Sequence, residues 1–452
     1  MNSVLILAGN VLVCATFGWA VLCVGAHERS STETLFLSIL VGMYIETLVA
    51  AIQMFLGLSL GIAGFTTVVA MAGVAIGIFY KHGVKTVRFA IDGPKWYEWL
   101  VLAAIAEKVL FAVWQLTRTH AYFQDALLHW SGRARALYGQ ANWSFDPSSP
   151  FFMGGYIGNR SYPLLTVLWR SLNAKFSGNW NDLIARADSL IFFVVVVGIV
   201  WIAVYRISNL RWMGAAAAYI VAAIPLHAWH AAAGYSDIAV EAFCVASVAA
   251  LLRREWLWAG VMSAGAIWSK NDALVLYMPG IFAAAALMQV DTAKRQLDWR
   301  NLRQFLMGFA TVLPWLAFNF IHGLGLTSAG GQLGWHGDAP SLLWHALIES
   351  PTSSILWICI LAAIVYTGMP MLKDLTGRAL MAGFFLSLSA ILFIFTATSA
   401  YEFLLDETTI HRVMMQFSGM AILTAMYGLS LKTPEFATAA ATAKKSKLRR
   451  SA

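Results

Sequence analysis

Asp125, His129 and Arg133 recur at every fourth position in the segment YFQDALLHWSGRARALYG, which spans residues 122–139. On a helix with about 100° per residue, these three side chains share one stripe, and apolar side chains occupy the other side. A carboxylate in such a place has the chemistry of a general base that takes a proton from a hydroxyl group. The alternative is a solvated surface helix in which Asp125 and His129 form an ordinary pair.

Lys270, in the segment WSKND, interrupts an otherwise apolar stretch. Breaks at membrane depth are tolerated only where they are buried in protein or line a wet cavity. A lysine at such a break is suited to hold a phosphate. In the alternative, Lys270 lies at the membrane interface and pairs with Asp272.

His411 and Arg412 precede the last apolar stretch of the chain. Arginine binds phosphate through two parallel hydrogen bonds, so a phosphate site is one interpretation of this pair. The other is an anchor at the membrane interface that pairs with Asp406 or Glu407.

Two shorter motifs carry less information. Asp237, in GYSD, belongs either to a site or to the N-cap region of a helix. Tyr162, in NRSYPLL, precedes a proline that begins or breaks a helix, and plain re-entry into the membrane accounts for that segment as well.

The elements that would position these residues are mostly membrane helices. Hydrophobic residues make up 59% of the 452 and charged residues only 12%, whereas a soluble domain carries about 25% charged residues. The net charge of +8 does not indicate a nucleic-acid partner, because the basic residues lie mostly in short loops, where they set membrane topology. We predict an all-α polytopic protein with about 13 transmembrane helices. Their apolar stretches begin near residues 4, 35, 63, 96, 189, 212, 238, 257, 273, 306, 354, 379 and 415.

The loops divide the chain into four predicted regions. These are N-terminal transmembrane helices (1–95), a catalytic transmembrane core (96–304) whose long external loop (118–188) carries amphipathic helices, C-terminal transmembrane helices (305–431) and a basic cytoplasmic tail (432–452). With the tail in the cytoplasm, about two thirds of the lysines and arginines face inward, as the positive-inside rule requires. The loops with the chemically interesting residues then share the outer face, which predicts a single external active site.

Taken in order, the segments DALLHWSGRARALYG, SYPLL, GYSD and SKND and a late arginine resemble the GT-C superfamily of polytopic glycosyltransferases. The similar branch contains protein O-mannosyltransferases and the aminoarabinose transferases of lipid A. The resemblance covers residues 122–291 and 401–412. The chain differs from that pattern in having three spans before the one that leads into the acidic loop, and in lacking the large soluble C-terminal domain of several members.

The resemblance implies a donor sugar on a polyprenyl phosphate, held in the membrane beside an outward-facing cavity. Asp125 would take the proton of the acceptor hydroxyl, and fixed cations would stabilise the departing phosphate, with inversion at the anomeric carbon. The implied phosphate-binding residues are Lys270, His411 and Arg412. The residues implied to shape the substrate pocket are Tyr162, Asp237 and Arg133. No set of metal ligands is evident in the sequence, and we expect no cofactor.

Two other classes of function stay open. A secondary transporter would use charged residues within its spans, such as Glu46, Glu107 and Lys108. A non-catalytic membrane assembly protein would use the outer loops as binding surfaces. The compact chain and the lack of organellar signals favour a bacterial inner membrane, with the active site facing the periplasm.

Overall fold

The computed structural model describes residues 2–24, 31–83, 95–120, 125–139, 143–153, 159–291, 296–325, 332–350 and 354–433. Helices make up nearly all the regular structure of these residues, so the predicted all-α class is confirmed. The described strands are one antiparallel pair, β1 (Val290–Asp291) and β2 (Gln296–Leu297). Residues 122–124 of the predicted amphipathic segment and nearly all of the predicted basic tail lie outside the described residues.

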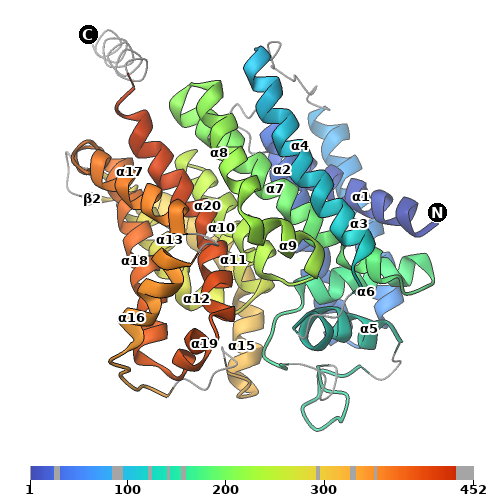
Figure 1. Ribbon diagram of the computed structural model, residues 1–452. Helices are drawn as coiled ribbons and strands as arrows, with labels where there is room; N and C mark the ends of the chain where they lie inside the picture. The colour runs from blue at the N-terminus through green and yellow to red at the C-terminus, as the bar shows by residue number, and fades with distance from the viewer. Residues whose placement is uncertain are drawn as a thin grey trace.

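Nine helical segments of the described chain are long and apolar enough to cross a membrane (Figure 1). An apolar helix of about 20 residues spans the hydrocarbon layer of a bilayer, so the chain is an integral membrane protein. The nine are α1 (Asn2–Val24), α2 (Ser31–Phe55), α3 (Leu60–His82), α4 (Trp96–Arg118), α7 (Asp182–Ser208), the joined run of α14 (Trp299–Phe309), η2 (Ala310–Val312) and α15 (Leu313–Ile321), α17 (Ser354–Lys373), α18 (Leu375–Ala397) and α20 (Thr408–Ser430).

A tenth span is formed if α8 (Arg211–Ala223) and α9 (Pro225–Ala233) are counted together. The two helices meet at an angle of 62°. Pro225 is the first residue of α9, and a proline cannot donate the hydrogen bond that would continue the preceding helix. The bend therefore follows from the sequence.

The predicted count of about 13 spans is not confirmed, although every predicted apolar stretch falls on a helix. The difference lies in four short helices: α10 (Asp237–Leu252), α11 (Trp256–Ser269), α12 (Asp272–Leu276) and α13 (Met278–Leu287). The longest, α10, has 16 residues and is roughly 24 Å long, which is shorter than the roughly 30 Å hydrocarbon layer. These helices pack largely against protein, which explains why their sequences are as apolar as those of true spans.

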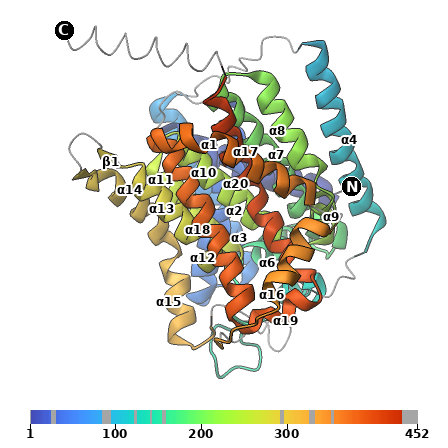
Figure 2. The same ribbon diagram turned by 60° about the vertical axis from the view of Figure 1, so that its left-hand side comes forward.

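Helix α10 lies in the middle of the bundle, with α11 and α20 beside it in both views (Figures 1 and 2). All its residues from Asp237 to Leu251 are buried. It packs against α7, α11 and α20. The charged residue at its first position is therefore held inside the protein.

The remaining helices are short, and several of them gather at one end of the bundle, where Figure 1 shows α5, α16 and α19. This is the end at which α10 begins. The short helices are the π-helix η1 (Ala126–Trp130), α5 (Ser131–Gly139), α6 (Leu165–Ser177), α16 (Ala339–Trp344), the π-helix η3 (His345–Glu349), the 3-10 helix η4 (Ser399–Tyr401) and α19 (Glu402–Leu405).

Candidate active site

Asp237 is fully buried at the start of α10, where three side chains donate to its carboxylate. Arg412 Nη2 lies 2.8 Å from Oδ2, and Lys270 Nζ lies 3.2 Å from Oδ1. The side-chain amide of Gln416 also donates to Oδ1. A buried charge without partners costs several kcal/mol, whereas this one has two cations and the positive end of a helix dipole. The helix N-cap is Ser236, and Asp237 is the first residue of α10.

Arg412, in the first turns of α20, joins Asp237 to Asp125. Its Nη1 lies 2.5 Å from Oδ2 of Asp125, and its guanidinium lies 4.5 Å from the ring centre of Tyr235. Among the described residues, no group accepts a hydrogen bond from Arg412 Nε. The partner of Asp125 is thus an arginine from the far end of the chain, and not the histidine one turn away.

Lys270 lies at the break between α11 and α12, with its side chain only 5% exposed and Nζ 2.8 Å from Oδ2 of Asp272. Asn271 stabilises the break. Its Nδ2 donates to the carbonyl of Ser161 at 2.5 Å, and its Oδ1 accepts from the indole of Trp315 at 3.0 Å. The predicted pairing of Lys270 with Asp272 is present, but the lysine is buried and also reaches the carboxylate at the start of α10, so it does not extend to the membrane interface.

We call five residues the charged cluster: Asp125, Asp237, Lys270, Asp272 and Arg412. The side chains of the charged cluster differ in their exposed fraction: Asp125 is 32% exposed, Arg412 is 15% exposed and Asp237 is fully buried. The carboxylates of Asp125 and Asp272, the latter 22% exposed, are therefore the members of the charged cluster most accessible to solvent. The charged cluster holds three carboxylates and two cations, so its acidic groups outnumber its basic groups by one.

Arg133, a predicted substrate-binding residue, positions the backbone around Tyr162. Its Nη1 donates to the carbonyls of Asn159 at 3.1 Å and Tyr162 at 3.0 Å, and its Nη2 donates to that of Met153 at 3.3 Å. Burial lowers the pKa of Arg133 to about 10, so it stays charged at neutral pH. The ring of Tyr162 stacks on Trp130, with ring centres 5.1 Å apart. Contact of either residue with a substrate stays a prediction, and the structure gives Arg133 a supporting position outside the charged cluster.

His411 is the predicted phosphate-binding residue that the structure does not bring to the charged cluster. Its Nε2 lies 3.3 Å from Oε2 of Glu407. Its ring instead lines a small hollow with Ile224 and Trp357. The alternative prediction of pairing with Glu407 therefore describes His411, whereas its neighbour Arg412 belongs to the charged cluster.

Three residues at the site were not predicted. Gln416 follows Arg412 by one helical turn on α20, a spacing that places both on one face. Tyr235 belongs to the GYSD segment, in which Asp237 was the predicted residue, and its ring lies against the guanidinium of Arg412. His230 is fully buried, and its Nδ1 lies 3.9 Å from Oδ2 of Asp237. Of these three residues, only Gln416 could have been predicted from the sequence, because it lies four residues after Arg412.

Comparison of the chain with protein-family models, with curated proteins and with solved structures gives no match. The resemblance to GT-C glycosyltransferases therefore stays a prediction. Within the described ranges, no three His, Cys, Asp or Glu side chains are grouped so as to hold a metal ion. The expectation that the protein needs no metal also stays a prediction.

Proposed function

We propose that the protein is a glycosyltransferase that moves a sugar from a polyprenyl phosphate to an acceptor hydroxyl at the outer face of the membrane. The observation that supports this is the meeting of Asp125, Asp237, Lys270 and Arg412, which come from four separate parts of the chain. The reaction needs a proton acceptor beside fixed cations. The charged cluster contains both, and its exposed side is formed by the carboxylate.

In the proposed reaction, the oxygen of the acceptor hydroxyl forms a bond to the anomeric carbon while Asp125 takes its proton. The bond between the anomeric carbon and the phosphate oxygen breaks, and the phosphate leaves with the electron pair. Lys270 and Arg412 stabilise the charge that develops on this phosphate. A single displacement of this kind inverts the anomeric configuration.

Arg412 connects donor binding to the proposed base. Its Nη1 is occupied by Asp125 and its Nη2 by Asp237, while Nε has no partner among the described residues. A phosphate that approaches from the exposed side replaces Asp125 more readily than the buried Asp237. The exchange would release Asp125 to accept a proton once the donor is bound, which favours binding of the donor before the acceptor.

The test is transfer of a radiolabelled sugar from a set of polyprenyl-phosphate donors by the purified protein in lipid vesicles. Asp125→Asn is expected to slow transfer by about 100-fold or more, because an amide cannot take the proton. Asp146→Asn is the matched control. Asp146 is an exposed carboxylate of the same long loop whose side chain bonds to Ser148, away from the charged cluster.

No transfer by the wild type from any of the donors would end the proposal. Wild-type rates in a folded Asp125→Asn variant would remove that residue from the role of base. A loss of transfer in Asp146→Asn as large as that in Asp125→Asn would show that the loop, and not the carboxylate, is what matters.

A proton-coupled secondary transporter is the second candidate, and a different pair of residues favours it. His227 Nε2 and Glu241 Oε2 lie 2.5 Å apart, and both side chains are fully buried. Glu241 also accepts hydrogen bonds from Ser418 and from the backbone of Gly419. Buried ionisable residues within membrane helices often form proton relays. Proton-driven uptake of a solute into vesicles, without sugar transfer, would establish this function instead.

A further inference from the structure

A cavity of about 850 Å³ lies at the end of α10 and α11 opposite the charged cluster. Helix α10 starts at Asp237 and leads to this cavity, and α11 leads back from it to Lys270. Since α10 has 16 residues, the two places are separated by roughly 24 Å. The cavity is therefore distinct from the candidate active site.

The cavity is formed where α11 and α14 cross. A Cβ on Gly260 would lie 2.0 Å from the carbonyl oxygen of Phe305, and one on Gly308 would lie 2.1 Å from that of Leu257. The two backbones are thus in direct contact. The lining residues fall within 254–258 and 299–307, so the cavity lies between the N-terminal parts of α11 and α14 and extends to their crossing.

The cavity carries positive charge that the protein does not neutralise. Arg300 and Arg303 are exposed on α14, and among the described residues neither guanidinium has a carboxylate partner. Glu255 also lines the cavity, but it is bonded to Arg253 at 2.9 Å. The nearby Arg254 donates to a backbone carbonyl of Met288 and is held there. Within the described part of the chain, the cavity lining therefore keeps two free guanidinium groups, about one helical turn apart.

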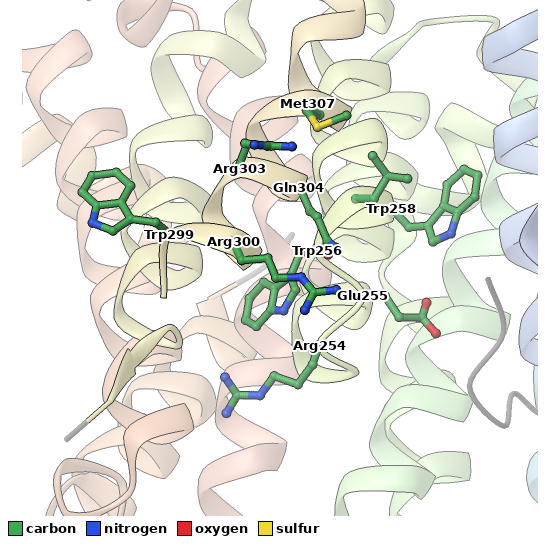
Figure 3. Close-up of a pocket in the computed structure, with 10 residues that line it drawn as sticks. Arg254, Glu255, Trp256, Trp258, Trp299, Arg300, Arg303, Gln304 and Met307 are labelled. Carbon is green, nitrogen blue, oxygen red and sulfur yellow. The ribbon is translucent and has the colours of Figure 1, made fainter. Parts of the chain in front are cut away.

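Tryptophans surround these arginines. In Figure 3, Arg300 and Arg303 lie between Trp299 on one side and Trp258 on the other. Trp299 is 70% exposed, whereas Trp256 is buried in the wall. Tryptophan is enriched where a membrane meets water, and arginine binds phosphate groups. A lipid with an anionic headgroup would contact both the apolar surface and the free cations of this cavity. A soluble phosphate ester would contact the cations alone.

We propose that this cavity binds an anionic phospholipid, with the headgroup phosphate on Arg300 and Arg303 and the adjoining chains against the tryptophans. The site does not depend on the function proposed for the charged cluster. It adds a specific lipid contact to the general preference of basic loops for anionic membranes.

The test uses the purified full-length protein in neutral detergent, titrated with short-chain phosphatidylglycerol or phosphatidylcholine and observed by native mass spectrometry. We expect at least tenfold tighter binding of phosphatidylglycerol. Replacing both arginines, Arg300→Gln with Arg303→Gln, is expected to weaken that binding by about 25-fold, or about fivefold for each charge removed. The matched control is Arg378→Gln, which removes an exposed arginine outside the cavity lining.

Equal binding of the two lipids, or unchanged phosphatidylglycerol binding by the double glutamine variant, would overturn the proposal. So would a fivefold loss in Arg378→Gln, the loss expected for each charge removed, because the effect would then be one of total charge. Free glycerol 1-phosphate that binds as tightly as the lipid would identify a soluble ligand instead. If the double glutamine variant unfolds at a lower temperature, the single variants Arg300→Gln and Arg303→Gln decide: each should weaken phosphatidylglycerol binding by about fivefold, and unchanged binding in both contradicts the proposed contact.

Discussion

Arg170 and Asp188 form an ion pair in which neither side chain is exposed to solvent. Nε and Nη2 of Arg170 each lie 2.9 Å from a carboxylate oxygen of Asp188. The remaining nitrogen, Nη1, donates to the carbonyl of Gly234 at 2.8 Å and to the hydroxyl of Ser131 at 3.0 Å. The pair therefore ties α6 and α7 to the turn before α10, and so helps to position Asp237.

Arg170→Met is expected to lower the free energy of unfolding by about 3–5 kcal/mol, because it leaves the buried carboxylate of Asp188 without its counter-charge. Unfolding in mixed detergent micelles measures this change. Glu349→Gln is the control: its Oε2 lies 2.8 Å from Nδ1 of His345 in η3, outside the candidate spans, and the two side chains are 55% and 59% exposed, so this pair contributes little. Similar losses in the two variants would show that the pair of Arg170 and Asp188 has no special importance.

Asp125→Asn and Asp237→Asn are expected to separate catalysis from stability. Under the proposed function, both should slow sugar transfer by about 100-fold or more. Asp237→Asn leaves Arg412 and Lys270 without their shared buried counter-charge, so it should also lower the free energy of unfolding by roughly 3 kcal/mol. Asp125 is 32% exposed, and its replacement should change that free energy by less than about 1 kcal/mol. A large destabilisation by Asp125→Asn would indicate a structural role.

The residues of the charged cluster were easier to predict than the helices that carry them. Asp125, Asp237, Lys270 and Arg412 stand out because charged side chains are rare in an apolar sequence, and at membrane depth each needs a partner. Which partners they take depends on tertiary contacts between distant segments. The lengths of α10 and α11 were not predictable in the same way, because a helix buried on all sides by protein is as apolar as one that faces lipid.

The predicted amphipathic stripe around Asp125 was only partly correct, and the π-helix η1 explains why. The backbone N–H of Ser131 donates to the carbonyl of Ala126, five residues earlier, so this turn holds an additional residue. Side chains beyond it are rotated from the positions expected at 100° per residue. Arg133, which follows η1, is buried, and Leu127, within η1, is 44% exposed, so polar and apolar side chains do not separate into the two regular stripes of an α-helix. Nothing in the residue types indicated a π-helix.

His129 is expected to make the structure sensitive to acid. Its Nδ1 accepts a hydrogen bond from the backbone N–H of Asn159 at 2.9 Å, which requires an unprotonated nitrogen. Burial lowers the pKa of His129 below its usual value, Asp125 partly opposes this shift, and nearby cations such as Arg133 add to it. In the unfolded chain, His129 takes up a proton at about pH 6.5, whereas in the folded chain it does so only at lower pH. The contribution to stability is therefore complete above about pH 6.5 and is lost as the pH falls.

Hydrogen exchange at residues 159–162 tests this expectation, with faster exchange at about pH 5.5 than at about pH 7.5 after correction for the intrinsic rate. His129→Gln should remove most of the difference. His345→Gln should leave it intact, since His345 is exposed and its hydrogen bond to Glu349 raises its pKa, which gives the opposite pH dependence. Identical pH dependence in the wild type and His129→Gln would assign the effect to another group.

Gly260 and Gly308 make the crossing of α11 and α14 sensitive to a single methyl group. Gly308→Ala would place a Cβ 2.1 Å from the carbonyl oxygen of Leu257, and backbone atoms cannot move aside as a flexible side chain does. The expected loss in the free energy of unfolding is about 1–3 kcal/mol. Gly73→Ala, on α3, is the matched control, because its Cβ would meet nothing within 4 Å.

The two substitutions should shift stability in opposite directions. Alanine favours a helix over glycine by about 1 kcal/mol, and in Gly73→Ala this is the only effect, so that variant should be slightly more stable than the wild type. In Gly308→Ala the clash outweighs the helix preference. Because α11 leads from this crossing to Lys270, Gly308→Ala should also slow sugar transfer more than Gly73→Ala does. A gain in stability in both variants would mean that α11 and α14 are not in backbone contact, and that the cavity between them has a different shape.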